Sequence, residues 1–152
     1  MKQNRVNRIM ENLKEMGISQ MLIVDPMSIY YLTGVYNEPH ERFYGLLLRE
    51  DGKHAYFLNN LFSIPQEVGA EKVWYSDTDP IMEMVARYVD HNKDLGVDKD
   101  LKARFLLPLM ELGAASGFMN TSIAIDTARG IKDEEEQELM RASSHINDMA
   151  MA

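Results

Sequence analysis

The chain lacks several features that would assign it to a function class at once. None of its 152 residues is a cysteine, which excludes disulfide scaffolds, thiolate zinc sites and cysteine nucleophiles. No run approaches the roughly 18 apolar residues of a membrane span, and residues 1–17 lack the apolar core of a signal peptide. We therefore expect a cytoplasmic protein that does not enter a membrane.

Positive charge is also scarce. The chain has 16 Lys and Arg against 24 Asp and Glu, a formal net charge of −8, and no basic cluster stands out. Because nucleic-acid binding requires a basic surface, we expect no nucleic-acid partner. The ordinary acidity of a cytoplasmic protein explains this charge, which would also permit a basic partner.

The familiar catalytic motifs are incomplete. Residues 40–44, HERFY, begin like the zinc-binding pattern HExxH, but Tyr44 supplies no second ligand. Residues 113–117, GAASG, place the serine one position late for the nucleophile motif GxSxG. The nine glycines are scattered and form no phosphate loop, and the four histidines lie far apart in the sequence. The residues by themselves therefore build no catalytic set.

Short apolar runs alternate with amphipathic segments along the chain. A chain of this length, 45% apolar, can bury one core as a single domain. The turn Asp51-Gly52 separates two of the apolar runs and predicts a hairpin. Strands are predicted at residues 20–25, 43–50, 54–58, 72–76, 95–98 and 120–126. With the helices between them, they predict a layered α/β domain with a mixed sheet.

Helix boundaries are marked by glycine and by acid–proline pairs. Apolar residues at helical spacing predict a helix over residues 6–16 that Gly17 ends. The pair Asp25-Pro26 predicts a capped helix start, and Gly34 ends that helix.

Two further helices follow from the same rules. The pair Asp79-Pro80 repeats the capped start, with Asp79 as the cap. Residues 101–112 are helical in composition, and Pro108 is expected to kink or divide that helix.

The last segment of the sequence predicts a helix that begins with a cap and has no end. Asp133 and Glu136 stand at capping-box spacing, and the acids at 133–136 suit the positive end of a helix dipole. An apolar stripe then continues to the last residues through Leu139 and Ile146. We expect this helix to pack on, or lead into, a further part of a longer protein.

Four segments together resemble one family. They are DPMSIYYLTG (25–34), EPHER (38–42), LGVDK (95–99) and RGIKDEEEQELMRAS (129–143). In order and spacing they resemble the N-terminal domain of the creatinase/prolidase metallopeptidases, the proline-specific "pita-bread" enzymes. The segment NEPHER is most similar to the bacterial Xaa-Pro dipeptidase (prolidase) branch.

The resemblance implies a fold and a division of the chain. Residues 1–130 would form a three-layer α/β domain, a mixed sheet flanked by helices with a ribonuclease H-like motif. Residues 131–152 would be the linker and the start of the first helix of a C-terminal catalytic domain.

The resemblance also implies a chemistry that this chain does not carry. In the family, two divalent metal ions, usually manganese, hydrolyse the bond before proline. Their ligands, two Asp, one His and two Glu, all belong to the C-terminal domain. The chain is therefore expected to be metal-free and inactive alone, within a parent that is a metal-dependent Xaa-Pro dipeptidase.

A role for the loop follows from the family's assembly. These enzymes are commonly homodimers, in which the N-terminal domain of one subunit narrows the neighbour's active site. By match to the loop that reaches this site, the resemblance assigns substrate gating to Glu38, His40, Glu41 and Arg42. Acids, a titratable His and an Arg fork suit the ammonium and carboxylate of a dipeptide. Glu38 stands where the family has Asp, which changes the reach of this side chain.

Alternatives remain open for both the loop and the parent. The loop can be a plain polar turn, with Arg42 in an ion pair within its own domain. The parent can be an aminopeptidase P or a creatinase-like enzyme. It can also be a binding module that has lost its metals, as in histone-chaperone subunits with peptidase-like domains. The metal ligands downstream of this chain would discriminate among these parents.

Overall fold

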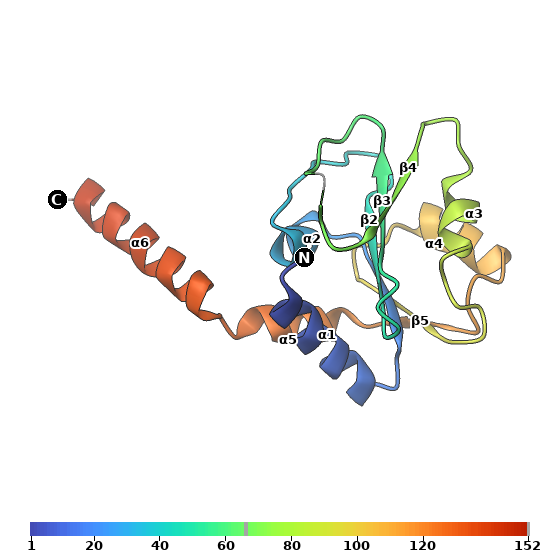
Figure 1. The fold of residues 1–152 in the computed structure, drawn as a ribbon, viewed down its shortest axis with the longest axis horizontal. Coiled ribbons are helices and arrows are strands. Elements are labelled where there is room, and N and C mark those ends of the chain that lie inside the picture. The colour runs from blue at the N-terminus through green and yellow to red at the C-terminus, as the bar shows by residue number, and fades with distance from the viewer. Residues whose placement is uncertain (66, 152) are drawn as a thin grey trace.

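The computed structural model describes residues 1–65 and 67–151, which form one mixed sheet with helices on both faces (Figure 1). The strand order across the sheet is β4-β3-β2-β1-β5-β6. The strands are β1 (Gln20–Ile23), β2 (Gly45–Arg49), β3 (Ala55–Asn59), β4 (Glu71–Tyr75), β5 (Leu95–Val97) and β6 (Phe118–Asn120). The helices are α1 (Gln3–Glu15), α2 (Pro26–Thr33), α3 (Ile81–Ala86), α4 (Ala103–Glu111), α5 (Ser122–Gly130) and α6 (Glu134–Met151).

Strand directions confirm the predicted mixed sheet. The pairs β1–β2 and β2–β3 are antiparallel, and the second of them is the predicted hairpin. The pairs β1–β5, β3–β4 and β5–β6 are parallel. At the hairpin turn, Gly52 has a φ of 77°, a conformation that favours glycine.

The central strands are buried on both faces, which produces three layers. In β1, Met21 and Ile23 face a core shared with α1, α2 and α5, whereas Leu22 faces the core under α3 and α4. All three side chains are fully buried, and burial of such a side chain stabilises the fold by about 1.5–3 kcal/mol. Two buried faces explain why the strands read as continuous apolar runs. The predicted three-layer arrangement is thus confirmed.

The predicted ends of α1 and α2 are confirmed. Gly17 follows α1 with a φ of 74°, and Gly34 ends α2 with a φ of 72°. The Asp25 carboxylate accepts hydrogen bonds from the backbone N–H groups of Met27 (3.2 Å) and Ser28 (2.9 Å). Asp25 therefore caps α2, and Pro26 occupies a position where its missing N–H costs nothing.

The strand predicted at residues 120–126 is wrong, because β6 ends at Asn120 and α5 begins at Ser122. The side-chain oxygen of Asn120 accepts hydrogen bonds from the Ser122 N–H (3.1 Å) and hydroxyl (2.8 Å), which turns the chain. Ala124 and Ala128 then pack in the core with α1, a helical spacing. The isoleucines of the segment favour a strand in isolation, but packing against α1 decides the outcome.

The cap predicted at Asp79 is also wrong. Its carboxylate accepts from the Ser76 N–H (2.6 Å) and hydroxyl (2.7 Å), and so it closes the preceding turn. Pro80 is the N-cap residue of α3, and no side chain caps that helix. The helix start is where it was predicted, but it lacks the predicted cap.

Pro108 does not divide α4, so that half of the prediction is wrong. The helix runs as one element past Pro108, whose carbonyl still accepts from the Leu112 N–H (2.9 Å). Proline lacks a backbone donor and its ring crowds the preceding turn, but the packing of the buried Leu109 retains the helix.

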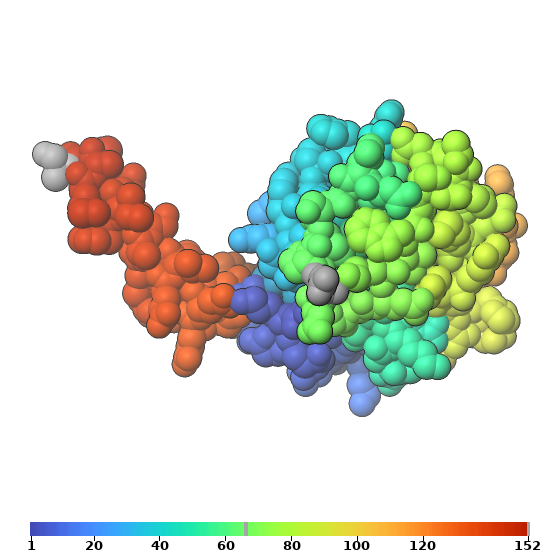
Figure 2. Space-filling model, turned by 45° about the horizontal axis from the view of Figure 1, so that its top comes forward, coloured from blue at the N-terminus to red at the C-terminus, as the bar shows by residue number. Residues whose placement is uncertain are grey.

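The helix α6 begins with the predicted capping box and projects from the body of the domain (Figures 1 and 2). The Glu136 N–H donates to Asp133 Oδ1 (2.9 Å), and the Asp133 N–H donates to Glu136 Oε2 (3.1 Å). None of the α6 residues that the structure describes is buried. No helix within residues 1–65 and 67–151 has both the length and the apolar character to cross a membrane.

The packing at β5 predicts the effect of one added methyl group. A Cβ at Gly96 would lie 2.5 Å from Thr121 Oγ1 and 3.2 Å from Ile18 Cγ2. Because Thr121 is fully buried, we expect Gly96→Ala to lower the free energy of unfolding by about 1–3 kcal/mol in a denaturant titration. The matched control is Gly130→Ala, where no atom lies within 4 Å and stability should stay the same or rise slightly. Equal stability of the two variants would contradict this packing.

Candidate functional site

The predicted gating residues lie on the loop between α2 and β2, beside a cleft at one edge of the sheet. Because β1 and β5 are parallel, their carboxyl ends meet at this edge, the usual place for a site in such a sheet. The cleft, about 340 Å³, is lined by the segments that follow the two strands and by the loop itself. Its ionisable lining residues are Asp25, Glu38, His40, Arg42, Asp100 and Lys102.

The buried carboxylate of Asp98 connects the segments that follow β1 and β5 at this edge. Asp98 is 5% exposed, and its Oδ2 accepts from the N–H groups of Val24 and Asp25, both at 2.8 Å. Its Oδ1 accepts from the Asp100 N–H at 2.7 Å. Burial raises the pKa of the Asp98 carboxyl, whereas the three donors act in the opposite direction. The chain after β1 and the chain after β5 are thus fixed to one side chain.

Glu38, the first acid of the loop, is held by hydrogen bonds from Tyr36 and His40. The Tyr36 hydroxyl donates to Glu38 Oε2 at 2.8 Å, and the His40 N–H donates to Oε1 at 3.4 Å. The Tyr36 hydrogen bond is the main cause of the lowered pKa of Glu38. Glu38 therefore presents an ionised carboxylate at the exposed side of the loop.

The tip of the loop is backbone-strained. His40 has a φ of 53°, in the left-handed region that non-glycine residues enter at a cost of about 1–2 kcal/mol. The Arg42 N–H donates to the Pro39 carbonyl (2.9 Å), and Lys102 Nζ donates to the His40 carbonyl (3.0 Å). These contacts hold the turn, which leaves the imidazole exposed. Glu41, next in the chain, is exposed as well.

Arg42 is bound to its own domain. Its guanidinium forms a two-pronged contact with Asp77, from Nε to Oδ1 at 2.9 Å and from Nη2 to Oδ2 at 2.7 Å. Asn59 Nδ2 donates to the same Oδ1 at 2.8 Å. The pair raises the pKa of Arg42 and lowers that of Asp77, mainly through these hydrogen bonds. This is the ion pair within the domain that the sequence left open as the alternative for Arg42.

The structure brings only some of the predicted residues together. Glu38 meets His40 through the backbone N–H of the latter, whereas Arg42 turns to Asp77. Sequence reasoning missed Asp77 and Lys102, which anchor the loop from positions 35 and 62 residues away in the chain. No local pattern links such distant residues to the loop, so only the fold could reveal them.

No group of three or more His, Asp or Glu side chains could hold a metal ion in the part of the chain that the structure describes. The described residues at the cleft therefore do not fit the two metal ions that the resemblance implies. The acidic and basic side chains that line the cleft can bind and orient charged groups.

The contacts of Asp98 predict a measurable loss of stability. In Asp98→Asn the amide must turn its NH₂ toward at least one backbone N–H, which leaves that donor without an acceptor. We expect a loss of about 1–3 kcal/mol in thermal or chemical unfolding and faster amide exchange at residues 24 and 25. The control is Asp100→Asn, since the Asp100 side chain is exposed. Equal stability and exchange in the two variants would show that Asp98 does not hold this edge.

Comparison with known proteins places this geometry in a family. Residues 5–131 match the model of the Creatinase/Prolidase N-terminal domain. An uncharacterized peptidase of Staphylococcus aureus (strain USA300) is 28% identical over 149 residues, which cover 95% of this chain and 41% of that protein. The chain thus spans about two-fifths of the length of the curated relatives it matches.

Two solved structures show the same fold. One is a recombinant prolidase from Thermococcus sibiricus, with a TM-score of 0.83 and 20% identity over 99% of this chain and 43% of that one. The other is the Creatinase/Prolidase N-terminal domain of an X-Pro dipeptidase from Streptococcus pyogenes, with a TM-score of 0.66. It is 22% identical and covers 84% of this chain and 99% of that chain. The chain belongs to the Creatinase/Prolidase N-terminal domain family.

Proposed function

We propose that this chain is the non-catalytic N-terminal domain of a Xaa-Pro dipeptidase, a metal-dependent hydrolase that acts as a homodimer. The observation that carries the proposal is the family match over residues 5–131 in a chain that spans 41% of its peptidase relatives. Solved neighbours that are prolidases or dipeptidases support the same choice of parent.

The proposal places catalysis after this chain. Residues 1–130 would be the N-terminal domain, and residues 131–152 the linker and first helix of a catalytic domain that holds two divalent metals, manganese for preference. The exposed apolar side chains of α6 support this division. Leu139 is 64% exposed, Ile146 62% and Met149 60%, and such a stripe is expected to be covered in the complete protein.

The loop at residues 38–42 would gate the neighbouring subunit's active site and recognise the two ends of the dipeptide. The ionised carboxylate of Glu38 suits the substrate ammonium, and Glu41 offers a second acid beside it. Arg42 could pair with the substrate carboxylate after exchanging Asp77 for it, a swap between chemically equal partners. His40 stands at the strained tip of the loop, between Glu38 and Arg42 in the chain. Such backbone strain is often found at functional sites, which supports a role for this loop in substrate binding.

The proposal predicts a change in substrate binding for two loop variants of the full-length, metal-loaded enzyme. His40→Ala and Arg42→Ala should each raise KM for Xaa-Pro dipeptides, or alter cooperativity, and leave the metal content intact. For Arg42 the loss of a charge-assisted hydrogen bond, about 1.5 kcal/mol, corresponds to a roughly tenfold effect. Steady-state kinetics and metal analysis by mass spectrometry measure both.

Three control variants separate recognition from loop structure. Asp77→Asn removes the anchor of Arg42 but keeps the guanidinium, so its KM should stay near the parent value or fall. If Asp77→Asn raises KM as much as Arg42→Ala does, then Arg42 only holds the loop. His91→Ala removes an exposed imidazole elsewhere and should change nothing. His40→Asn keeps a residue that tolerates the left-handed backbone, so a raised KM there isolates the imidazole.

A further inference from the structure

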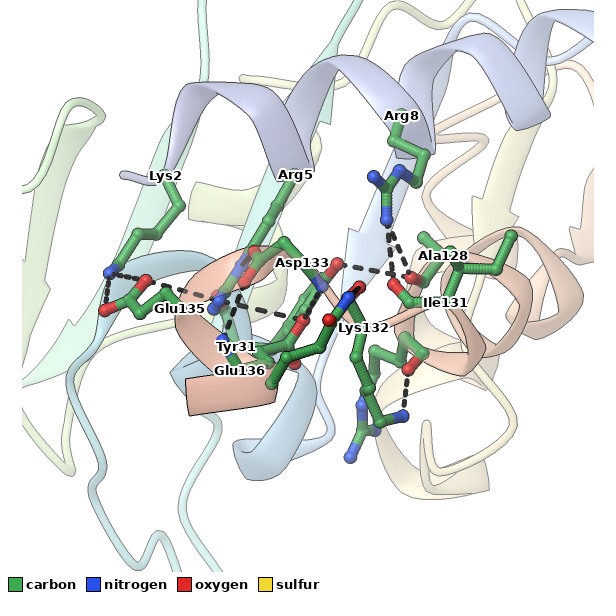
Figure 3. Close-up of polar contacts among 12 residues, drawn as sticks. Lys2, Arg5, Arg8, Tyr31, Ala128, Ile131, Lys132, Asp133, Glu135 and Glu136 are labelled. Atoms are coloured by element: carbon green, nitrogen blue, oxygen red, sulfur yellow. Dashed lines mark hydrogen bonds and ion pairs between the residues drawn. The ribbon is translucent and has the colours of Figure 1, made fainter. Parts of the chain in front are cut away.

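The junction between α5 and α6 is attached to the body of the domain through one face of α1 (Figure 3). Arg5 and Arg8 of α1 and Lys2, the N-cap residue before it, stand three residues apart, so they project from the same side. Their partners are the backbone carbonyls at the end of α5 and the acids of the first turn of α6. We call these contacts the elbow, defined by Lys2, Arg5, Arg8, Tyr31, Ile131, Asp133 and Glu135.

Arg5 is the buried member of the elbow. Its side chain is 8% exposed, and its Nε donates to Asp133 Oδ2 at 2.7 Å. Its Nη1 donates to the carbonyl of Tyr31 in α2 at 2.8 Å, and the guanidinium lies 4.5 Å from the centre of the Tyr31 ring. Its Nη2 approaches Glu135 Oε2 at 3.4 Å. One planar group thus joins three helices, α1, α2 and the start of α6.

The other contacts of the elbow are more exposed. Lys2 Nζ pairs with Glu135 at 2.5 Å, with 39% and 54% of the two side chains exposed. Arg8 Nη1 donates to the Ile131 carbonyl at 2.9 Å on the exposed side. Exposed ion pairs are weakened by water and salt. Loss of a buried, hydrogen-bonded guanidinium is more destabilising, because its partner is left as an uncompensated charge.

We propose that Arg5 is a positioning residue that fixes the direction in which α6 leaves the domain. The Asp133 carboxylate performs two tasks at once, because Oδ1 caps α6 while Oδ2 binds Arg5. The helix start and its attachment to α1 therefore share one rigid group. No described side chain of α6 is buried, so the helix has no core packing against the domain that would fix its direction in place of this contact.

Arg5 is linked to the loop through α2, because it binds the Tyr31 carbonyl near the end of that helix and the chain after α2 leads into the loop. In a protein where α6 enters a catalytic domain, Arg5 would set the position of the loop relative to that domain. This last consequence rests on the proposed function, whereas the direction of α6 is a property of the chain itself and is tested on it.

The absence of native cysteines permits a direct distance measurement. Spin labels at Glu83→Cys, on α3, and Ser144→Cys, on α6, are both at exposed positions. Double electron–electron resonance on the 152-residue chain should give one narrow distance distribution. In Arg5→Met, which keeps the length of the side chain but removes the fork, we expect the distribution to become at least twice as wide. Arg5→Lys should also widen it, because a single ammonium cannot hold the carboxylate and the carbonyl in the same geometry.

The matched control is Arg104→Met, the same chemical change on an exposed part of α4, which should leave the distribution narrow. If Arg5→Met does not fold, Asp133→Asn decides. Its side-chain oxygen can still cap α6, but the charge that Arg5 binds is gone, and the distribution should widen. A narrow distribution in the folded Arg5 variants or in Asp133→Asn, or a wide one in the parent chain, overturns the proposal.

An NMR titration tests the contact independently. Arg5 and the Glu136 N–H hold the pKa of the Asp133 carboxyl at about 2. In a folded Arg5→Met or Arg5→Lys the carboxyl should titrate closer to the ordinary value for Asp, about 3.9. An unchanged pKa would show that Arg5 does not bind Asp133 in solution. These measurements need no activity, so they can fail or succeed independently of the proposed peptidase.

Discussion

The buried carboxylate of Asp98 accepts hydrogen bonds from the N–H groups of Val24 and Asp25, the two residues between β1 and α2. Those N–H groups lie beyond the paired residues of β1 and are partly buried, so without Asp98 they would lose the acceptor that satisfies them. The contact fixes Asp25, which caps α2 and also meets Arg129 of α5 at 3.3 Å. The other end of α2 binds Arg5. The loop, the cleft and the elbow thus all contact or adjoin α2, and Asp98 fixes the residues at which α2 starts.

The elements that local rules govern could be predicted from the sequence. The helix stop at Gly17, the cap at Asp25 and the capping box at Asp133 depend on neighbouring residues, and all are present. The predictions failed where distant contacts decide. Residues 122–126 carry isoleucines that favour a strand, but they pack as a helix on α1. The Asp79 carboxylate accepts a hydrogen bond from the Ser76 N–H and does not cap α3.

The candidate site shows the same division more sharply. Sequence reasoning found the loop, because its composition is unusual and resembles a family segment. It could not find Asp77 or Lys102, which meet the loop only after β4 and α4 have been placed in the sheet layers. It also could not choose between a substrate and an internal partner for Arg42. The fold supplies the internal partner, and a substrate would have to compete with it.

We propose that this domain serves a metallopeptidase whose metal ions are bound downstream, and the sequence of the gene beyond codon 152 tests this most directly. We expect a further catalytic domain that carries two Asp, one His and two Glu as metal ligands in the family's order. An intact protein mass together with metal content would then confirm that this domain is expressed and loaded. A reading frame that stops shortly after Ala152, or that replaces those five ligands, would contradict the account. The loop at residues 38–42 would then have to be studied as the binding surface of a protein that is not a peptidase.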